Sequence, residues 1–355
     1  MFWLTFRIII YIIIFTGIWY GGSFYVAQKL ITQLQQTSSH AIFVDKNISK
    51  SNFLSNNQNG AFAFPFATIS SALQSAKEKN IDTIIIAPGI YEEKLELPEN
   101  IILSAAHENV VIIKKETNSY TLKTNNNTKI LNIDIFGARN TVIIPHNTST
   151  TFINSMIANA HDFGIKMEKK KRPPILPGQN KSIVYEILEK TKDEISEMPL
   201  VRFNNVIIAK NDNQGMYLQD GRVEIINSKI IKNGEEGIDL HPHMFVTILN
   251  TNSSFNGESG LESEVYDNIV TIENSTFKNN IKSGVAFLTS LGTGNITLTN
   301  IKSINNAQFG MRCAVHKNRP AYPRPFFQST VNWQDPNNIF ENNLRRNIAT
   351  ECYTF

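Results

Sequence analysis

The chain of 355 residues has little cysteine and little charge. Two cysteines are too few for a disulfide-dense scaffold, and no CxxC pair or cysteine–histidine cluster indicates a zinc site. Charged residues make up 18% of the chain and the formal net charge is only +3, which argues against nucleic-acid binding. The hydrophobic fraction of 41% is ordinary for a globular protein, so disorder of the whole chain is excluded.

The first 27 residues differ from the rest. Ile8 to Ala27 runs for twenty residues without a charged side chain, about the length that spans a bilayer. A cleavable signal peptide is the rival interpretation, but Tyr25 stands where its cleavage site needs a small residue. We expect residues 1–40 to be a signal-anchor or transmembrane segment with a linker, and residues 41–355 to form one domain.

Either interpretation of the N-terminal segment places the remaining chain outside the cytoplasm, in the periplasm or at the cell surface. Oxidising compartments permit disulfide bonds. Cys313 and Cys352 are therefore expected either to pair or to remain free thiols, and the sequence leaves both alternatives open.

An internal repeat is the strongest signal in the sequence. Six asparagines are each followed, ten residues later, by a glycine, and in five of the six units a second asparagine lies four residues before that glycine. The glycines from Gly215 onward are 22, 23, 24 and 26 residues apart. The first asparagines are Asn154, Asn205, Asn227, Asn250, Asn274 and Asn300, and the glycines are Gly164, Gly215, Gly237, Gly260, Gly284 and Gly310.

Short, β-branched segments such as Val223 to Ile226 and Val246 to Leu249 separate the repeat positions, and none leaves room for a helix. A period of 22 to 26 residues with three short strands per turn predicts an all-β, right-handed parallel β-helix, a solenoid. Equivalent asparagines of stacked coils are expected to form hydrogen-bonded ladders. The glycine suits a corner with positive φ or a crowded backbone. A β-sandwich or propeller would require hairpin turns that are missing.

The N-terminal part of the domain fits the start of the same solenoid. Thr68 to Asn80 has apolar residues at helical spacing and predicts an amphipathic helix that caps the end of the β-helix. A strand over Thr83 to Ala87 and the turn Pro88–Gly89 follow it. This region resembles the opening of the pectin-lyase-like superfamily of right-handed β-helix proteins, and the residues that carry the resemblance are Gly60, Pro65 to Ile69, Ala72–Leu73, Ile84 to Gly89 and Tyr91 to Glu93.

Alternate side chains after each repeat glycine face opposite sides of the predicted strand. The first and third residues after the glycine are mostly apolar and face the core, so the second and fourth face outward. The +2 column is Lys166, Tyr217, Asp239, Glu262, Ala286 and Arg312, and the +4 column is Glu168, Gln219, His241, Glu264, Leu288 and Ala314. Neighbours within a column are expected about 4.8 Å apart, so Asp239, His241, Glu262 and Glu264 form a compact group. A solvated strand face is the alternative interpretation.

The variation in repeat length falls on one side of the solenoid. The stretch from each repeat glycine to the next asparagine is 12, 13, 14, 16 or, after Gly164, 41 residues long. Insertions on one face often build a binding wall. The largest insert, about residues 169–200, contains the basic run Lys169 to Arg172 and a predicted amphipathic helix over Ser182 to Ser196. Arg319 to Phe327 is a second excursion, either an aromatic wall or a C-terminal cap.

Gly237, Asp239 and His241 form a G-x-D-x-H motif that resembles the site of mannuronan C5-epimerases, which carry Tyr-Gly-Phe-Asp-Pro-His. Glu264 occupies the place of the second-coil Asp of that family. Glu236 stands where the family has a catalytic tyrosine, and Tyr217 on the preceding coil is the candidate replacement.

The resemblance implies proton abstraction at C5 of a uronate in an acidic polysaccharide, followed by epimerisation or β-elimination. Asp239, His241, Glu264, Glu262 and Tyr217 are the candidate catalytic residues, with His241 as base or acid. The candidate substrate-binding residues are Gln219, Arg222, Arg312 and His243. No cofactor is firmly implied, although the carboxylates also suit Ca²⁺.

Two other functions remain open at this stage. A noncatalytic β-helix that binds glycan or serves as a surface scaffold explains the fold and the anchor equally well. A glycoside hydrolase is a weaker alternative, because two outward carboxylates across a groove would serve it. The expected partners are an acidic glycan and, through the N-terminal helix, a membrane.

Overall fold

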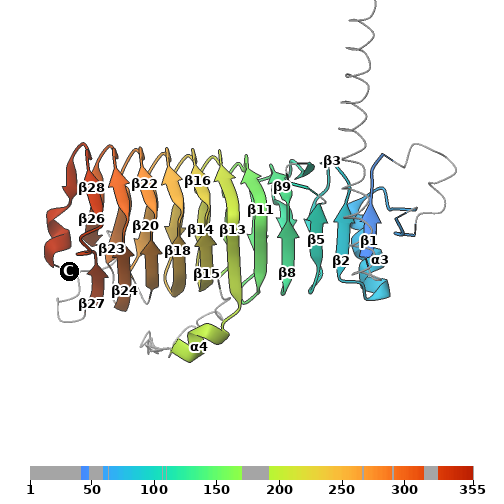
Figure 1. Cartoon of the computed structure of the whole chain (residues 1–355), viewed down its shortest axis with the longest axis horizontal. Coiled ribbons are helices and arrows are strands. Elements are labelled where there is room, and N and C mark those ends of the chain that lie inside the picture. The colour runs from blue at the N-terminus through green and yellow to red at the C-terminus, as the bar shows by residue number, and fades with distance from the viewer. Residues whose placement is uncertain are drawn as a thin grey trace, which may run out of the picture.

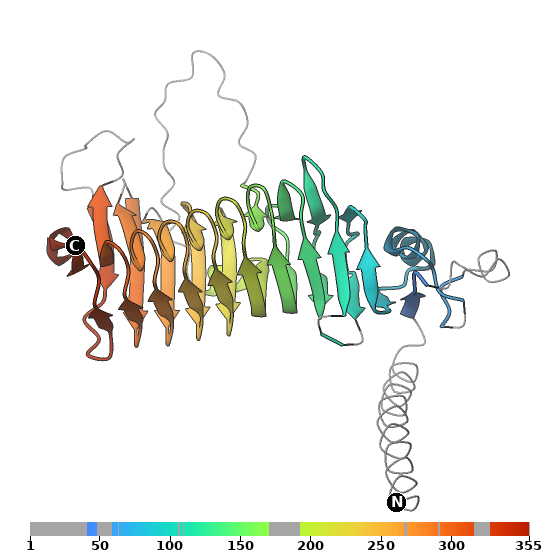
Figure 2. The same ribbon diagram turned by 90° about the horizontal axis from the view of Figure 1, so that it is seen from above.

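The computed structural model describes residues 41–47, 59–62, 64–105, 107–108, 110–169, 192–265, 268–289, 292–315 and 327–354. These residues are mostly β-strand and wind into an elongated solenoid whose coils follow one another in chain order (Figures 1 and 2). The apolar segment Ile8 to Ala27 lies outside them. Within the described ranges, no helix has the length and apolar character needed to cross a membrane.

One sheet carries the outward columns and is built from one strand per coil, in sequence order. Its parallel registers place each repeat unit beside the next, as for β14–β17 and β17–β20. Its strands are β4 (Leu95–Glu96), β7 (Tyr120–Lys123), β10 (Asn140–Ile144), β12 (Ile165–Met167), β14 (Met216–Leu218), β17 (Ile238–Leu240), β20 (Leu261–Glu264), β23 (Val285–Thr289), β26 (Phe309–Val315) and β29 (Arg346–Ile348).

The second sheet supplies the other two sides of each coil. Its later strands pair in two parallel rows, β15–β18–β21–β24–β27 and β16–β19–β22–β25–β28. The predicted parallel β-helix with three strands per coil is therefore confirmed. The strands of this sheet are β1 (Ala41–Val44), β2 (Thr83–Ile86), β3 (Gly89–Tyr91), β5 (Ile102–Ala105), β6 (Val111–Lys114), β8 (Thr128–Leu131), β9 (Ile133–Phe136), β11 (Thr150–Ala158), β13 (Leu200–Ala209), β15 (Gly221–Ile226), β16 (Lys229–Ile231), β18 (Met244–Leu249), β19 (Asn252–Ser254), β21 (Ile269–Glu273), β22 (Thr276–Lys278), β24 (Gly292–Thr299), β25 (Lys302–Ile304), β27 (Phe327–Asn332) and β28 (Ile339–Glu341).

Two asparagine ladders run along the solenoid, as the repeat predicts. The first asparagine of each unit adopts the left-handed conformation, and Asn205, Asn250 and Asn300 each donate to the equivalent asparagine of the preceding coil, as for Asn250 Nδ2 to Asn227 Oδ1 at 3.2 Å. The second asparagines form a buried ladder, in which Asn233 Nδ2 donates to Asn256 Oδ1 at 3.0 Å. These amides also accept bonds from backbone N–H groups, so they satisfy polar groups that the turn would otherwise leave unpaired.

The repeat glycines are required by crowding rather than by a positive φ. A Cβ atom on Gly237 would meet Ser253 Oγ at 2.2 Å, Asn256 Nδ2 at 2.7 Å and the carbonyl oxygen of Gly260 at 2.7 Å. Only a residue without a side chain fits between the stacked coils there. The sequence left both explanations open, and the structure decides for close approach.

The core lies inside the coils and is lined by the residues expected to point inward. The first and third residues after the repeat glycines, such as Ile238 and Leu240, are fully buried. Phe152 and Phe203 stack in the interior with ring centroids 5.3 Å apart. Buried and partly exposed residues alternate in β12, β14, β17 and β20, which fixes the outward faces of the two columns there.

The predicted N-terminal helix is α3 (Ile69–Lys79), which begins after Thr68 and ends at Asn80. Its apolar face, including Ile69 and Leu73, is buried, and it lies beside β1 and β2 (Figure 1). In the insert, α4 (Lys192–Glu197) covers only the end of the helix expected over 182–196, and residues 170–191 lie outside the described part. The excursion 319–327 lies outside it except for its last residue, which begins β27.

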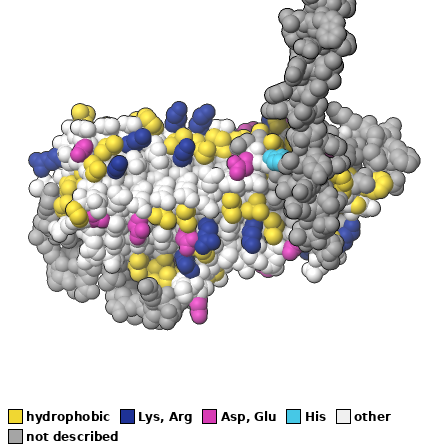
Figure 3. All heavy atoms as spheres, viewed as in Figure 1, with side chains coloured by type: hydrophobic (Ala, Val, Ile, Leu, Met, Phe, Trp, Pro, Cys, Tyr) yellow, Lys and Arg dark blue, Asp and Glu magenta, His cyan; other side chains and the backbone are white. Residues whose placement is uncertain are grey.

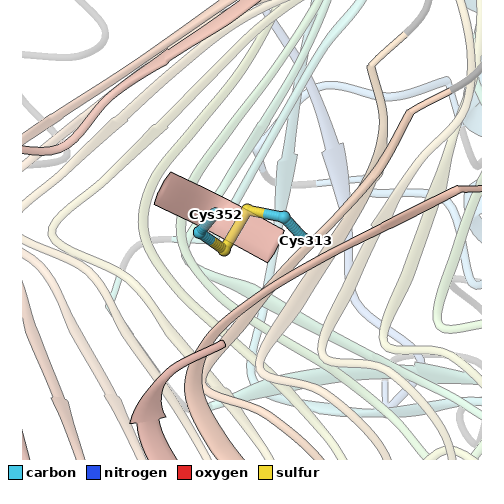
Figure 4. The surroundings of a disulfide bond; sticks show 2 residues. All are labelled: Cys313 and Cys352. Carbon is cyan, nitrogen blue, oxygen red and sulfur yellow. A yellow bond between two sulfur atoms is a disulfide. The ribbon is translucent and has the colours of Figure 1, made fainter. Parts of the chain in front are cut away.

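The last coil is joined covalently to the solenoid. Cys313 of β26 and Cys352 of the 3₁₀ helix η3 (Thr350–Thr354) form a disulfide across 39 residues (Figure 4). Both side chains are buried at the C-terminal end of the core. Of the two alternatives that the sequence left open, the structure shows the paired state.

We expect the double substitution Cys313→Ala and Cys352→Ala to lower the free energy of unfolding by about 2–4 kcal/mol, because the open loop gains entropy in the unfolded chain. Urea unfolding followed by circular dichroism measures the difference. Wild-type protein in excess dithiothreitol is the control and should match the double variant. Equal stability of the reduced and oxidised chains would contradict the prediction.

Candidate functional site

The polar residues of the +2 column lie in register on three adjacent coils. Tyr217 of β14 pairs with Asp239 of β17, and Asp239 pairs with Glu262 of β20. Because neighbouring strands are about 4.8 Å apart, Tyr217 and Glu262 flank Asp239 at a backbone separation of roughly 10 Å. The expected column of outward residues is therefore formed.

His241, at the end of β17, is held by carboxylates on both sides of its ring. Its Nε2 lies 3.1 Å from Oδ2 of Asp239, and its Nδ1 lies 3.4 Å from Oε1 of Glu264. The imidazole also packs on the ring of Tyr217, with centroids 4.4 Å apart. Four of the five predicted catalytic residues thus form one contact network.

The charge state of His241 follows from this network. Burial lowers the pKa of the imidazole, but the hydrogen bonds to Asp239 and Glu264 outweigh that effect and raise the pKa to about 10. His241 is consequently an imidazolium cation at neutral pH. Of the two roles that the sequence left open for His241, this charge state favours the acid over the base.

Two other members of the group have raised pKa values. Burial, and then the negative charge of Asp239, raises the pKa of Glu262 to about 7. Burial, and then the charges of Asp239 and Glu264, raises the pKa of the Tyr217 hydroxyl. At neutral pH, Glu262 is therefore poised between its two protonation states, whereas Tyr217 keeps its proton.

Three of the five predicted catalytic residues border a pocket of about 270 Å³ on the outer face of the first sheet. Tyr217, His241 and Glu264 line it beside residues of the loops that follow β14 and β17. Lys169, the first residue of the insert and the last described before its gap, lies at the same pocket. The variable side of the solenoid thus borders the candidate site, as the length variation predicts.

The predicted substrate-binding residues do not all join the site. His243 and Gln219 line the pocket, and Gln219 Nε2 donates to the carbonyl oxygen of Met167 at 3.1 Å. Arg312 lies in the +2 column but is separated from Glu262 by Ala286. Arg222 lies on β15 of the other sheet, where it bonds to the carbonyl oxygen of Ser196 at 2.7 Å.

Glu236 is a member of the site that the sequence treated only as a missing tyrosine. Its side chain is 5% exposed, and Gln214 Nε2 donates to its Oε2 at 3.2 Å. Burial, then a hydrogen bond with Glu258 and the charge of Glu262, raises the pKa of Glu236 to about 9. It is a neutral carboxylic acid at neutral pH.

The corner glycine explains why sequence reasoning missed Glu236. Strict alternation would turn the residue before Gly237 inward, but the chain bends at this corner. Phe163 holds the equivalent position two coils earlier, and its ring lies 4.8 Å from that of Tyr217 in the outward column. Residues that precede the repeat glycines therefore lie beside the +2 column. Strand alternation does not predict this placement, because it results from the bend of the chain at the corner.

The Ca²⁺ alternative finds no prearranged set of ligands here. Among the residues that the structure describes, no three His, Cys, Asp or Glu side chains converge as a metal-binding group. The pocket-lining carboxylate of Glu264 and the carboxylate of Asp239 are instead directed at His241.

Comparisons with known proteins concern mainly the fold. Residues 195–352 match the family model described as "Right handed beta helix region". A comparison with curated protein sequences gives no significant match.

Among solved structures, a pectate lyase, Pel9A, superposes with a TM-score of 0.52 at 14% identity, covering 85% of this chain and 79% of that one. A pectin methylesterase has a TM-score of 0.46 at 9% identity, covering 82% and 93%. The A-module of the mannuronan C-5 epimerase AlgE6 from Azotobacter vinelandii has a TM-score of 0.37 at 13% identity, covering 76% and 93%. The family model and the first of these structures identify the fold of this chain as a right-handed parallel β-helix.

Proposed function

We propose that this chain is an enzyme that acts on an acidic polysaccharide by removing the C5 proton of a uronate residue. The observation that carries the proposal is the cationic His241, clamped between Asp239 and Glu264 beside Tyr217 at an open pocket. The similarity to pectate lyase Pel9A supports the fold, and the substrate class is an inference from the site's chemistry.

His241 would supply the cation that the reaction needs. The C5 proton of a uronate is weakly acidic while the adjacent carboxylate keeps its full negative charge. An imidazolium with a pKa of about 10 would offset the charges of Asp239 and Glu264, so that the enediolate formed when the proton leaves is repelled less by these two carboxylates. Asp239 and Glu264 would act as positioning residues that keep His241 charged.

Glu262 and Tyr217 would transfer the protons. A sugar ring above Asp239 would have Glu262 on one side and Tyr217 on the other, since they occupy the adjacent coils. Glu262, with a pKa of about 7, would accept the C5 proton while the C–H electron pair moves into the carboxyl group. Tyr217 would donate its proton to the opposite face of C5, or to O4 as the C4–O bond breaks. The first outcome is epimerisation and the second is β-elimination.

Incubation of the full chain with alginate, polymannuronate and polygalacturonate in heavy water tests the proposal. Proton NMR detects C5 inversion and deuterium at C5, and ultraviolet absorbance detects unsaturated chain ends. Deuterium uptake without new ends identifies an epimerase, and new ends identify a lyase. Binding without either signal would overturn the proposal and favour the noncatalytic glycan-binding alternative.

The pH dependence of the rate gives an independent prediction. The rate should rise as the pH passes about 7, because Glu262 becomes an available base, and fall as the pH approaches about 10, because His241 loses its charge. Initial rates of deuterium uptake between pH 5 and 10 measure the profile. A maximum near pH 5 would exclude Glu262 as the base.

We also propose that the β-helix works outside the cytoplasm, held there by the apolar segment Ile8 to Ala27. The disulfide between Cys313 and Cys352 supports this location, since such bonds persist in oxidising compartments.

A further inference from the structure

One corner of the solenoid carries an unusual set of residues. The corner follows β11, β13, β16, β19, β22, β25 and β28, and its backbone is left-handed in each of these coils, with φ between 54° and 61°. Backbone hydrogen bonds link this corner to the adjacent coil, as where Lys232 N donates to the carbonyl oxygen of Ser254 at 3.2 Å. The residues at this corner are Asn159, Lys210, Lys232, Phe255, Asn279, Asn305 and Asn342.

Asparagine is the residue type, after glycine, that best tolerates a left-handed backbone. Lysine and phenylalanine do not share this tolerance, so Lys210, Lys232 and Phe255 cost stability at positions where other coils have Asn. All three are exposed, with Phe255 52% exposed, and therefore no core contact compensates. Backbone strain at the same corner of three consecutive coils, without burial to offset it, indicates that the side chains themselves have a function.

These side chains border a groove of about 440 Å³. Its floor includes Gly234 and Gly257, which present bare backbone to solvent, and Ile281, 63% exposed, lies at the same groove. Asp212 also lines it, with its Oδ2 3.4 Å from Nδ1 of His161. Figure 3 shows basic side chains beside hydrophobic ones along this upper edge of the molecule.

We propose that the groove lined by Lys210, Lys232, Phe255 and Ile281 binds a linear anionic polysaccharide. The two ammonium groups rise from adjacent coils and can pair with the carboxylate or sulfate groups of successive sugars. The face of Phe255 offers a stacking platform for a sugar ring, and the bare backbone leaves room for it. A lipid surface would suit a continuous apolar face, whereas here two lysines, Asp212 and bare backbone lie between the apolar residues.

The groove stands close to the candidate site along the chain. Only Asn233 to Gly237 separate Lys232 from β17, which carries Asp239. A polymer held at the groove would raise the local concentration of its own segments at that site. The choice of an acidic glycan rests on the proposed function, but the binding itself requires no turnover.

Asparagine substitutions at the corner test this proposal. Lys210→Asn with Lys232→Asn, and Phe255→Asn separately, restore the residue type of the other coils, so the thermal midpoint should stay constant or rise. Affinity electrophoresis of the full chain in gels containing alginate or polygalacturonate measures binding, with dextran as the neutral comparison. We expect each variant to raise the dissociation constant about tenfold.

The matched control is Lys229→Asn with Lys302→Asn, which removes the same charge from exposed strand positions outside the groove. It should bind like the wild type. An equal loss of affinity in the control would show that only net charge matters and would overturn the proposal. Wild-type affinity in the corner variants would also overturn it. Stronger binding of the wild type than of the corner variants to phosphatidylserine vesicles, with no binding to any polymer, would assign the groove to lipid and overturn the proposal.

Turnover separates this proposal from the proposed function. Groove-dependent binding without deuterium uptake or new ends would leave the groove established and remove the reaction. Turnover together with equal binding by the wild type and the corner variants would support the reaction and overturn the proposal for the groove.

Discussion

The His241→Gln variant is expected to lose about a hundredfold to a thousandfold in the rate of C5 deuterium uptake, the loss that follows removal of one preorganised charge-stabilising group. Glutamine can hydrogen-bond to Asp239 or Glu264, but it carries no positive charge. The enediolate would therefore form next to two uncompensated carboxylates. Proton NMR in heavy water, under substrate saturation, measures the rate.

His107→Gln is the matched control, because His107 is exposed in the N-terminal part of the solenoid, far from β17 along the chain. It should retain the wild-type rate. Thermal unfolding of both variants shows whether each is folded at the assay temperature. A folded His241→Gln protein with the wild-type rate would remove His241 from the mechanism.

The Gly234→Ala variant is expected to lose about 3 kcal/mol or more of its free energy of unfolding, because the added methyl group would clash with the backbone of the adjacent coil. A Cβ atom at this glycine would lie 1.9 Å from the carbonyl oxygen of Asp212 and 2.8 Å from its carbonyl carbon. Both atoms belong to the backbone of the adjacent coil, so relief requires separating the coils. Urea unfolding measures the change in free energy.

Gly221→Ala provides the comparison for this effect. The nearest atom to its Cβ would be the terminal methyl carbon of Met167, at 2.8 Å. That atom ends a flexible side chain and can move away, so we expect a change of about 1 kcal/mol or less. Similar losses in the two variants would show that the stacked backbone is more pliable at Gly234 than its distances indicate.

Much of the fold could be read from the sequence because one chemical requirement recurs in every coil. Asn256 must bond to both neighbouring coils, and Gly237 must admit a neighbouring backbone, so their spacing is fixed. Strand alternation after the glycine then determines which residues face outward. Asp239 and His241 could be assigned to the outer face on that basis alone.

The parts of the site that escaped prediction depend on bends and on charge. Alternation fails at a corner, so Glu236 was not recognised as a neighbour of Asp239 and Glu262. Arg222 lies past the left-handed Asp220, where the chain has already turned into the second sheet. The protonation of His241 depends on two carboxylates approaching it at once, and residue spacing does not give those distances.

The two asparagine ladders have a consequence for how such a protein can change. Both ladders lie in the ten-residue half of the repeat, and an insertion there would break hydrogen bonds to the coils above and below. The other half, 12 to 41 residues from glycine to asparagine, begins with the outward columns and contains the loop that joins them to the next strand. Loops can therefore be exchanged between relatives, or grafted by design, beside the candidate site while the solenoid keeps its register. Substrate specificity could then change through the loops while the fold stays the same.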